Sequence, residues 1–491
     1  MHSKVKRKPP LWLSLVPFVS LILIMLPSVI ILGADPQIPL IICIGITAFI
    51  GIFVLGYSWS DIENAMIESN AAAMQANFII MLVGCLMGVW MSGGVVPGLI
   101  YYGLKLFTPG IFLAALPILC AIISISTGSA WTTAGTIGVS AMGVAAGLGI
   151  PFPIAAGAII TGAQFGDKLS PLSDSTNLAA GITGTNLFTH VRHMLWSTIP
   201  SFVLAVGCFA VIGAGYSGSN VDDSQIQMIC DVLQANFHIT PWILLAPLSI
   251  ILIMILHVPA IPGMAVGTAI GVIFALVQGN SLGDIMQQML YGFELTSGSD
   301  SVDKLLNRGG MQSMMYTISL VICALAFGGA IKCIGCLDVF IETILLSCRT
   351  RASIMIANIF FCIGMNFLAA DQYMSIVIPG QMFKETYKKL NLAPENLSRL
   401  LEDAGTLTSG IVPWSTCGAL YYSVLGVSAF VYFPFCFMAY LNPLISALYA
   451  VTGFKLTPLD PSKPIRDRLE DIEEIYFYNE RTNSKNRAHA E

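Results

Sequence analysis

The segment Thr161–Ala180, TGAQFGDKLSPLSDSTNLAA, places charged and hydroxyl side chains inside an otherwise apolar tract that is rich in glycine and alanine. An ionisable side chain at the centre of a bilayer costs roughly 2.5–3.5 kcal/mol on insertion scales. Two aspartates and a lysine within one potential membrane span therefore need partners, water or a function.

The backbone of the same segment is expected to break. Pro171 lacks an N–H group and disrupts the preceding helical turn, and Gly162 and Gly166 are expected to loosen the chain before it. These residues predict a membrane helix broken in mid-bilayer, with free backbone groups and small hydroxyls around a polar site. A hydrophilic loop between two spans is the alternative, because the apolar flanks of the segment are short.

The composition places the whole chain in a membrane. Of its 491 residues, 55% are hydrophobic and 10% are charged, whereas soluble domains carry about 25% charged residues. The formal net charge of −5 argues against a nucleic-acid partner. We expect an all-α polytopic membrane protein whose partners are the lipid bilayer and a small substrate. The oligomeric state stays open, with a homodimer as one option.

The chain contains an internal repeat with a constant offset. Ser170–Ser173 aligns with Val412–Ser415, and the two prolines lie 413 − 171 = 242 residues apart. Ser129 aligns with Asp371 at the same offset, 371 − 129 = 242. Two separate polar motifs that share one offset indicate a duplication. We expect two inverted repeats, each with about five crossings, a re-entrant helical hairpin and a broken helix; the hairpins span 111–148 and 352–390, and the broken helices 152–187 and 396–428.

Hydropathy divides the chain into five parts. They are a basic N-terminal segment at 1–10, a first transmembrane repeat at 11–214, an external linker at 215–240, a second transmembrane repeat at 241–455 and a tail at 456–491. Of 23 Lys and Arg residues, Lys105, Lys304 and Arg308 fall outside and Lys168 lies in the polar segment, which leaves 23 − 4 = 19 inside. The excess of basic residues on one side predicts cytoplasmic N- and C-termini.

Four motifs resemble the NhaC family of Na+/H+ antiporters: Gly166–Ala180, Thr127–Thr133, Ala370–Tyr373 and Val412–Thr416. The resemblance covers nearly all of the chain between about 11 and 455. It implies a secondary active transporter in the bacterial plasma (inner) membrane that exchanges cytoplasmic Na+ for external protons by alternating access. It implies no cofactor, with Na+ and H+ as transported ions. Some relatives exchange malate and lactate with Na+ and H+, so a Na+- and/or H+-coupled organic-anion exchanger is the alternative.

The residues themselves argue for ion transport rather than catalysis. The chain contains no H-E-x-x-H, G-x-S-x-G or G-x-x-x-x-G-K-[ST] motif, which argues against an enzyme. A Na+ site needs hard oxygen ligands, and proton coupling needs a carboxylate whose charge can be removed. Such groups occur in both repeats.

Asp174 is the first candidate for the proton-exchanging carboxylate, since no basic residue is adjacent to it. Asp167 is the second, since the neighbouring Lys168 could hold it ionised as a structural pair. The structural alternative for either aspartate is an N-cap where the broken helix restarts. We expect Asp174, Ser173 and Asn177 to supply the Na+ ligands.

The wider candidate site takes polar residues from both repeats. Asp371 replaces Ser129 of the first repeat, so the duplicated site is not symmetric. Glu402 and Asp403, before the second break, belong either to a cytoplasmic helix face or to the ion path. The further candidates are Thr127, Ser129, Ser170, Thr176, Asp371, Gln372, Ser415 and Thr416.

Overall fold

The computed structural model describes residues 7–469 except for 73, 217–222, 257, 298–302, 304–305, 340–342 and 344–347. The predicted segments 1–10, 215–240 and 456–491 therefore lie partly outside the described residues. Within those residues the chain is helical and forms no β-strand, only two isolated bridges. Six helices are long and apolar enough to cross a membrane, or eight if two bent pairs each count as one span. The prediction of an all-α polytopic membrane protein is confirmed.

The helices follow one another through the first half as α1 (Leu11–Ser14), α2 (Val16–Ile30), α3 (Gln37–Phe49), η1 (Ile50–Leu55), α4 (Trp59–Ala72), α5 (Met74–Ser92), α6 (Val95–Leu106), α7 (Pro109–Thr127), α8 (Ala130–Thr133), η2 (Ala134–Gly138), α9 (Val139–Gly147), α10 (Phe152–Leu169), α11 (Asp174–Thr183) and α12 (Leu187–Tyr216). The second half contains α13 (Asp223–Asn236), η3 (Pro241–Leu244), α14 (Leu245–Ile255), α15 (Ala260–Val277), α16 (Leu282–Tyr291), α18 (Met311–Cys333), α20 (Arg351–Leu368), α21 (Met374–Lys389), α22 (Pro394–Leu401), η4 (Glu402–Thr406), α23 (Leu407–Ser409), α24 (Thr416–Leu425), α25 (Ala429–Tyr432), η5 (Phe433–Phe435) and α26 (Phe437–Thr452).

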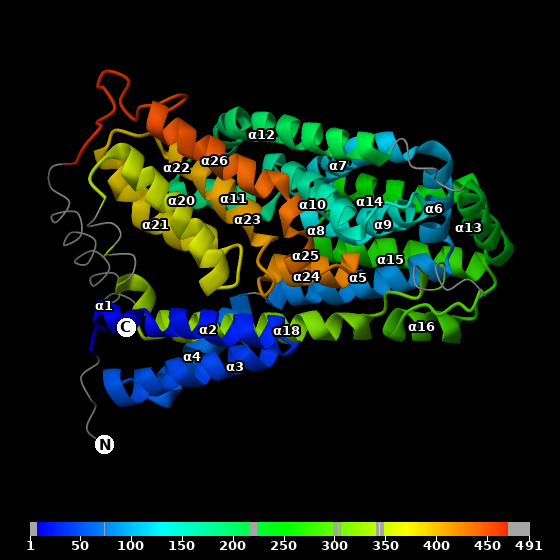
Figure 1. Ribbon diagram of the computed structural model, residues 1–491, viewed down its shortest axis with the longest axis horizontal. Coiled ribbons are helices and arrows are strands. Elements are labelled where there is room, and N and C mark those ends of the chain that lie inside the picture. Colours follow the sequence, from blue (N-terminus) through cyan, green and yellow to red (C-terminus); the bar gives the residue numbers. More distant parts are fainter. Residues whose placement is uncertain are drawn as a thin grey trace.

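The helix boundaries repeat at the offset that the sequence predicts. Helices α7 and α20 begin 351 − 109 = 242 residues apart, and α10 and α22 begin 394 − 152 = 242 residues apart. Helices α11 and α24 begin 416 − 174 = 242 residues apart, and each has ten residues. In Figure 1 the hairpin α20–α21 lies to the left and its counterpart, which runs from α7 to α9, lies to the right, the arrangement expected of inverted repeats.

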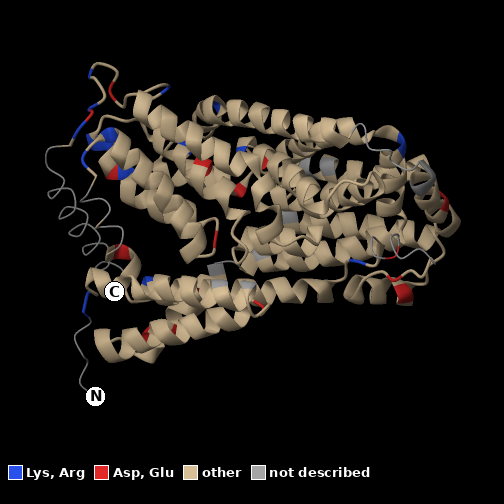
Figure 2. Cartoon of the chain, in the orientation of Figure 1, with Lys and Arg blue, Asp and Glu red and all other residues tan. Residues whose placement is uncertain are grey.

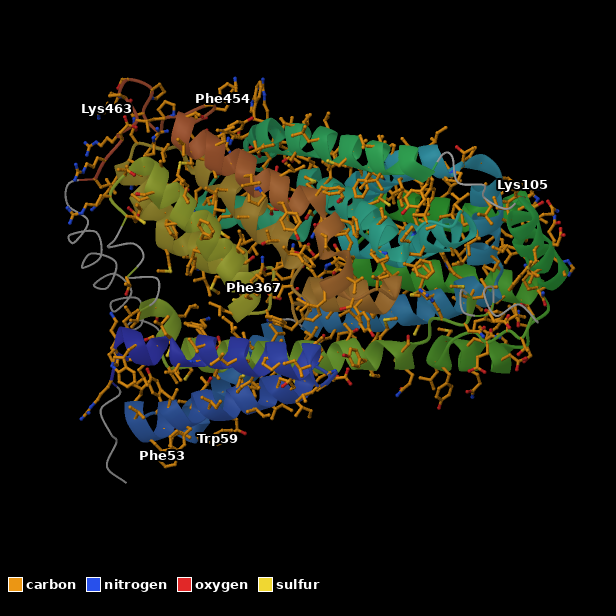
Figure 3. The ribbon with its side chains drawn as sticks, viewed as in Figure 1. Phe53, Trp59, Lys105, Phe367, Phe454 and Lys463 are labelled. Carbon is orange, nitrogen blue, oxygen red and sulfur yellow. The ribbon has the colours of Figure 1, made fainter. Side chains whose placement is uncertain are left out.

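Both predicted helix breaks are present. Helix α10 ends at Leu169, and α11 begins at Asp174 after an irregular stretch that contains Pro171. The second break separates α23 from α24 and contains Pro413. Phe367, close to the end of α20, lies near the middle of the long axis of the molecule (Figure 3). Residues at both breaks and at both hairpin tips are buried, so these features lie in the interior of the helical bundle: Ser170, Ser173, Ser415, Thr416, Trp131 and Asp371.

The expectation that Gly162 and Gly166 loosen the backbone is wrong, because α10 is helical through both residues. Their function is close packing against α7. A Cβ atom at Gly162 would collide with the carbonyl oxygen of Pro117, and one at Gly166 with that of Ala121. Small residues of this kind let two membrane helices approach closely. The contact fixes the first broken helix against the first hairpin.

The predicted linker at 215–240 is more ordered than its polar composition suggests. Helix α12 continues to Tyr216, and α13 occupies Asp223–Asn236. Helix α13 contacts α6 and α9, and buries Ile229 and Leu233 in the apolar core beneath it. The apolar positions of α13 share one face, which explains why a hydropathy average over the whole segment misses the helix.

We expect Gly162→Ala to lower the thermal midpoint of the purified protein in detergent by several degrees. Alanine gains about 1 kcal/mol of helix propensity over glycine, so a loss of stability would report the collision with Pro117. Gly181→Ala in α11 is the matched control, because a Cβ there meets no atom within 4 Å. A midpoint for Gly162→Ala at or above that of the wild type would contradict this packing.

Candidate functional site

Both hairpin tips meet the second helix break. The indole Nε1 of Trp131, in α8, donates to the Cys417 Sγ at 3.3 Å. The backbone N–H of Thr416 donates to the carbonyl oxygen of Ala370 at 2.9 Å. The first turn of α24 is thus held between the two tips. Tyr373, at the second tip, also lies within electrostatic range of three aspartates of the candidate site: Asp167, Asp174 and Asp371.

Several predicted site residues of the first repeat hold its irregular backbone together. The Ser170 hydroxyl donates to the Ile125 carbonyl at 2.8 Å, which joins the break to α7. The Thr176 hydroxyl donates to the Lys168 carbonyl at 3.0 Å. The hydroxyls of the hairpin tip are engaged locally: Ser129 caps α8 by accepting from the Thr132 N–H, and Thr127 donates to the Ser129 carbonyl.

The two candidate aspartates differ in burial. Asp174 lies in the first turn of α11 with an exposed side chain, and Ser173 is the N-cap residue. Asp167 is only 9% exposed and lies next to the Ser173 hydroxyl and the backbone of Ala130. Of the three predicted Na+ ligands, Ser173 is buried, whereas Asp174 and Asn177 are exposed. The Asn177 amide nitrogen donates to two carbonyls of the break, at 2.8 Å each.

The predicted site residues of the second repeat form a buried hydrogen-bond network. Asp371 Oδ1 accepts from the Met374 N–H at 3.0 Å, and its Oδ2 lies 3.5 Å from the Thr416 hydroxyl. Gln372 Oε1 accepts from Ser409 and from Cys417, at 3.2 and 2.8 Å. Ser415 caps α24 by accepting from the Gly418 N–H at 3.0 Å. The second break is therefore closely tied to its hairpin tip.

Lys168 does not pair with Asp167, and that prediction is wrong. Its ammonium group pairs with Asp403 of η4 in the fully buried interior. Successive side chains on a helix point about 100° apart, so Asp167 and Lys168 face different neighbours. Asp167 faces the break, whereas Lys168 faces the packed helices behind it.

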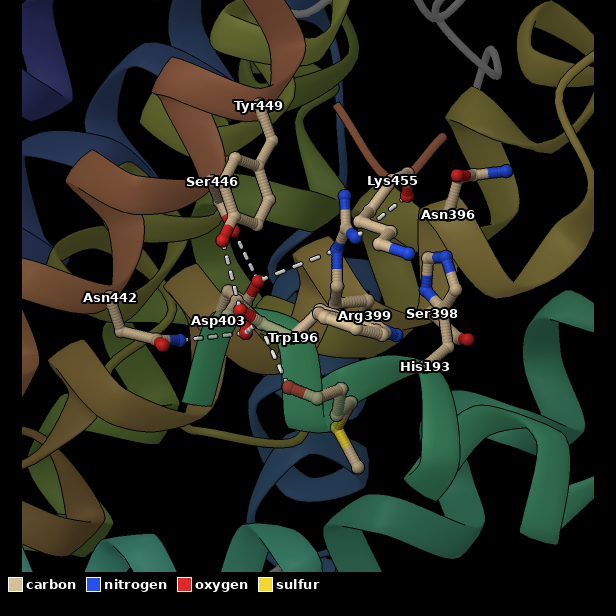
Figure 4. Close-up of polar contacts among 12 residues, drawn as sticks. His193, Trp196, Asn396, Ser398, Arg399, Asp403, Asn442, Ser446, Tyr449 and Lys455 are labelled. Atoms are coloured by element: carbon tan, nitrogen blue, oxygen red, sulfur yellow. Dashed lines mark hydrogen bonds and ion pairs between the residues drawn. The ribbon is translucent and has the colours of Figure 1, made fainter. Parts of the chain in front are cut away.

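Asp403 collects donors from four helices, and Figure 4 shows those from Arg399, Asn442 and Ser446. Ser197 of α12 donates to its Oδ1 at 2.9 Å, and Asn442 of α26 donates to the same atom at 2.7 Å. Ser446 of α26 donates to Oδ2, and Arg399 Nε of α22 forms an ion pair at 3.8 Å. Together with Lys168 of α10, these groups satisfy the carboxylate completely. Asp403 is thus an interior residue and does not lie on a cytoplasmic helix face.

Glu402, the residue before Asp403, is also fully buried. Neither of its carboxylate oxygens has a hydrogen-bond partner among the described residues. The hydroxyls of Thr406 and Ser175 lie close to it, and Lys168 and Asp167 lie within its electrostatic range. Two buried carboxylates therefore face the same region from different repeats.

Sequence reasoning missed the polar residues that surround Asp403. Ser197, Asn442 and Ser446 are polar residues within mainly apolar helices, and each lies at least 39 residues from Asp403 in the chain. The available signal was their position within membrane spans, where an isolated polar side chain usually has a partner in the bundle interior. Within the described residues, no group of three His, Cys, Asp or Glu side chains could hold a metal ion. Serine and threonine hydroxyls, such as that of Ser173 beside Asp167, are not part of such groups.

We expect Asp403→Asn to destabilise the protein by about 3–5 kcal/mol, the usual loss when one partner of a buried ion pair is removed. The change leaves Lys168 and Arg399 buried without an anion. Thermal unfolding in detergent measures the effect. Asp460→Asn, at an exposed ion pair with Lys463, is the control and should change little. Equal midpoints for the two variants would show that Asp403 is not the anchor described here.

Comparisons with known proteins agree with this architecture. The model of the Na+/H+ antiporter family matches residues 11–176 and 162–454. The chain is 42% identical to the Na(+)/H(+) antiporter NhaC of Alkalihalophilus pseudofirmus, over 88% of this chain and 93% of that protein. It is 37% identical to the malate-2H(+)/Na(+)-lactate antiporter of Bacillus subtilis, over 81% and 86%. It is 32% identical to the arginine/ornithine antiporter ArcD of Halobacterium salinarum, over 93% and 95%. The chain belongs to the Na+/H+ antiporter family.

Proposed function

We propose that this protein is a secondary active transporter that exchanges Na+ for H+ by alternating access. Membership of the Na+/H+ antiporter family supports the exchange. The observation that carries the mechanism is a buried carboxylate, Asp167, directly before a break in a membrane helix. Broken helices provide free backbone carbonyls and hydroxyls that coordinate cations in secondary transporters.

In the proposed mechanism, Asp167 binds Na+ when it is ionised and releases Na+ when it is protonated. Both ligands require the same negative charge, so they compete for the carboxylate and exchange becomes obligatory. Lys168 is paired with Asp403 and does not neutralise Asp167. A buried carboxylate without a cation or proton is energetically unfavourable. The transporter is therefore expected to change its conformation only when Na+ or a proton is bound to Asp167.

The choice between the two aspartates rests on burial. Asp174 remains a predicted participant from sequence, and its exposed position suits a role in drawing cations towards the site. The burial of Asp167 and the adjacent buried hydroxyl of Ser173 support Asp167 as the exchanging carboxylate. The attraction between a cation and a carboxylate is stronger in the interior, where the dielectric constant is low, than at the surface.

An organic-anion exchanger is less well supported, although one relative is named as a malate/lactate antiporter. A buried carboxylate substrate would need a free cation close to the break. The two cations nearest to it, Lys168 and Arg399, both form ion pairs with Asp403. Transport assays with added malate or lactate separate the two functions.

We further propose a bacterial plasma-membrane location with both termini cytoplasmic. Lys and Arg are concentrated at the end of the molecule that contains α1 and the outer end of α21 (Figure 2). Lys105 and Lys463 lie at opposite ends of the molecule (Figure 3). The basic end would face the cytoplasm according to the positive-inside rule.

We expect Asp167→Asn to reduce Na+ uptake driven by a pH gradient in proteoliposomes about tenfold or more, because asparagine cannot exchange a proton for a cation. Asp174→Asn, the same change at the first residue of α11, is the comparison and should retain more activity. In the wild type, the apparent Na+ affinity should weaken as the pH falls. Full exchange in Asp167→Asn with loss in Asp174→Asn would assign the role to Asp174.

The orientation can be tested with single introduced cysteines. Ala235 in α13 and Ser462 after α26 are both exposed. A membrane-impermeant maleimide added outside intact cells should label Ala235→Cys and not Ser462→Cys, with the unmodified protein as the background. Labelling of Ser462→Cys alone would reverse the proposed orientation.

A further inference from the structure

Glu402 is the one candidate residue of the second break whose burial has no structural explanation among its described neighbours. It is 0% exposed, and among the described residues no donor forms a hydrogen bond of good geometry with either carboxylate oxygen, although the hydroxyls of Thr406 and Ser175 lie close to it. The next residue, Asp403, is equally buried but is satisfied by the surrounding donors and by two cations. Lys168 and Arg399 form their ion pairs with Asp403, although Lys168 also lies within electrostatic range of the Glu402 carboxylate. A buried carboxylate left in this state needs a ligand that supplies positive charge.

The backbone at Glu402 has a form that often marks functional sites. Residues Glu402–Thr406 form the π-helical turn η4 between two α-helical segments. Such turns are rare and frequently occur at functional sites because they redirect side chains from the regular helix. The hydroxyl oxygen of Thr406, at the other end of this turn, is also buried and without a hydrogen-bond partner.

A row of oxygen atoms links this turn to the first repeat. The Glu402 carboxylate lies close to the hydroxyls of Thr406 and Ser175. The Ser175 hydroxyl, in α11, lies 3.1 Å from the Ser173 hydroxyl, which in turn neighbours Asp167. All of these side chains are buried. Carboxylate and hydroxyl oxygens are the hard ligands that small cations prefer.

We propose that Glu402 and Thr406 are ligands of the transported cation, which is held between the second repeat and Asp167 of the first. This inference rests on the proposed Na+ transport and adds the second half of the ion site. Lys168 and Arg399 together carry one more charge than Asp403, so a single bound cation completes the charge balance of the two carboxylates Glu402 and Asp167. The cation thereby links the η4 turn to the first repeat. The ion is a small monovalent cation such as Na+.

The duplication indicates one such site and not two. Glu402 corresponds to position 402 − 242 = 160, which is Ile160, and Thr406 to position 406 − 242 = 164, which is Gln164. The first repeat therefore has no carboxylate at the equivalent turn, and α10 is a regular α-helix there. Each repeat contributes a different carboxylate to a single shared site.

The test uses the full-length protein purified in detergent and Na+ alone as the probe. Glu402→Gln and Thr406→Val keep the size of each side chain but remove the proposed ligand. Glu395→Gln in the first turn of α22 is the matched control, since it makes the same chemical change outside the site. The readouts are the thermal midpoint with and without Na+, and the KM for Na+ in proteoliposomes.

In Na+-free buffer we expect the midpoints of Glu402→Gln and Thr406→Val to equal or exceed that of the wild type, because the first change removes a buried charge and the second removes an unsatisfied hydroxyl. The rise in midpoint that Na+ produces in the wild type should be largely lost in Glu402→Gln and reduced in Thr406→Val. The KM for Na+ should rise about tenfold or more in Glu402→Gln, while Glu395→Gln behaves like the wild type.

Two results would overturn the inference while leaving Na+ transport intact. One is an unchanged Na+ response in Glu402→Gln. The other is a lower midpoint of Glu402→Gln in Na+-free buffer, which would make Glu402 a structural residue. A wild-type protein that neither transports Na+ nor responds to it would overturn the proposed function and this inference together.

Discussion

The buried carboxylate of Asp403 is the interaction on which the interior of this protein depends. Charged groups inside a membrane protein are stable only with partners, and Asp403 accepts from side chains of α10, α12, α22 and α26. The Lys168–Asp403 pair also crosses from one repeat to the other. By engaging both nearby cations, Asp403 leaves Asp167 without a fixed counter-charge and leaves Glu402 only the more distant charge of Lys168, which is already paired. The transported cation can then provide the positive charge that these two carboxylates need.

The sequence predicts the fold well because its strongest signals are local or repeated. The hydropathy of the spans, Pro171 and Pro413 at the breaks, and the offset of 242 residues each act without knowledge of the tertiary structure. The structure repeats that offset at the starts of α7 and α20 and of α10 and α22. Local signals fail where a feature depends on a distant neighbour. Gly162 is an example, since only the approach of Pro117 in α7 explains why a side chain is excluded there.

The candidate site is less predictable, because its partners come from distant parts of the chain. From sequence, Lys168 is adjacent to Asp167, but its partner Asp403 lies 235 residues away. Glu402 and Asp403 are neighbours of the same charge, and nothing in the sequence distinguishes the satisfied carboxylate from the unsatisfied one. Asp174 and Asp167 differ in burial only after α11 packs against α21 and η4. Such differences arise from tertiary packing, which a motif does not encode.

The central claim is that one cation is held between Asp167 and Glu402 in the interior. The most direct measurement is a crystallographic search for thallium, a monovalent cation visible by its anomalous scattering, in crystals grown with and without competing Na+. We predict a single anomalous-difference peak between the carboxylates of Asp167 and Glu402, and we predict that Na+ displaces it. A Na+-displaceable peak at Asp174 or Asp371, with none between Asp167 and Glu402, would contradict it.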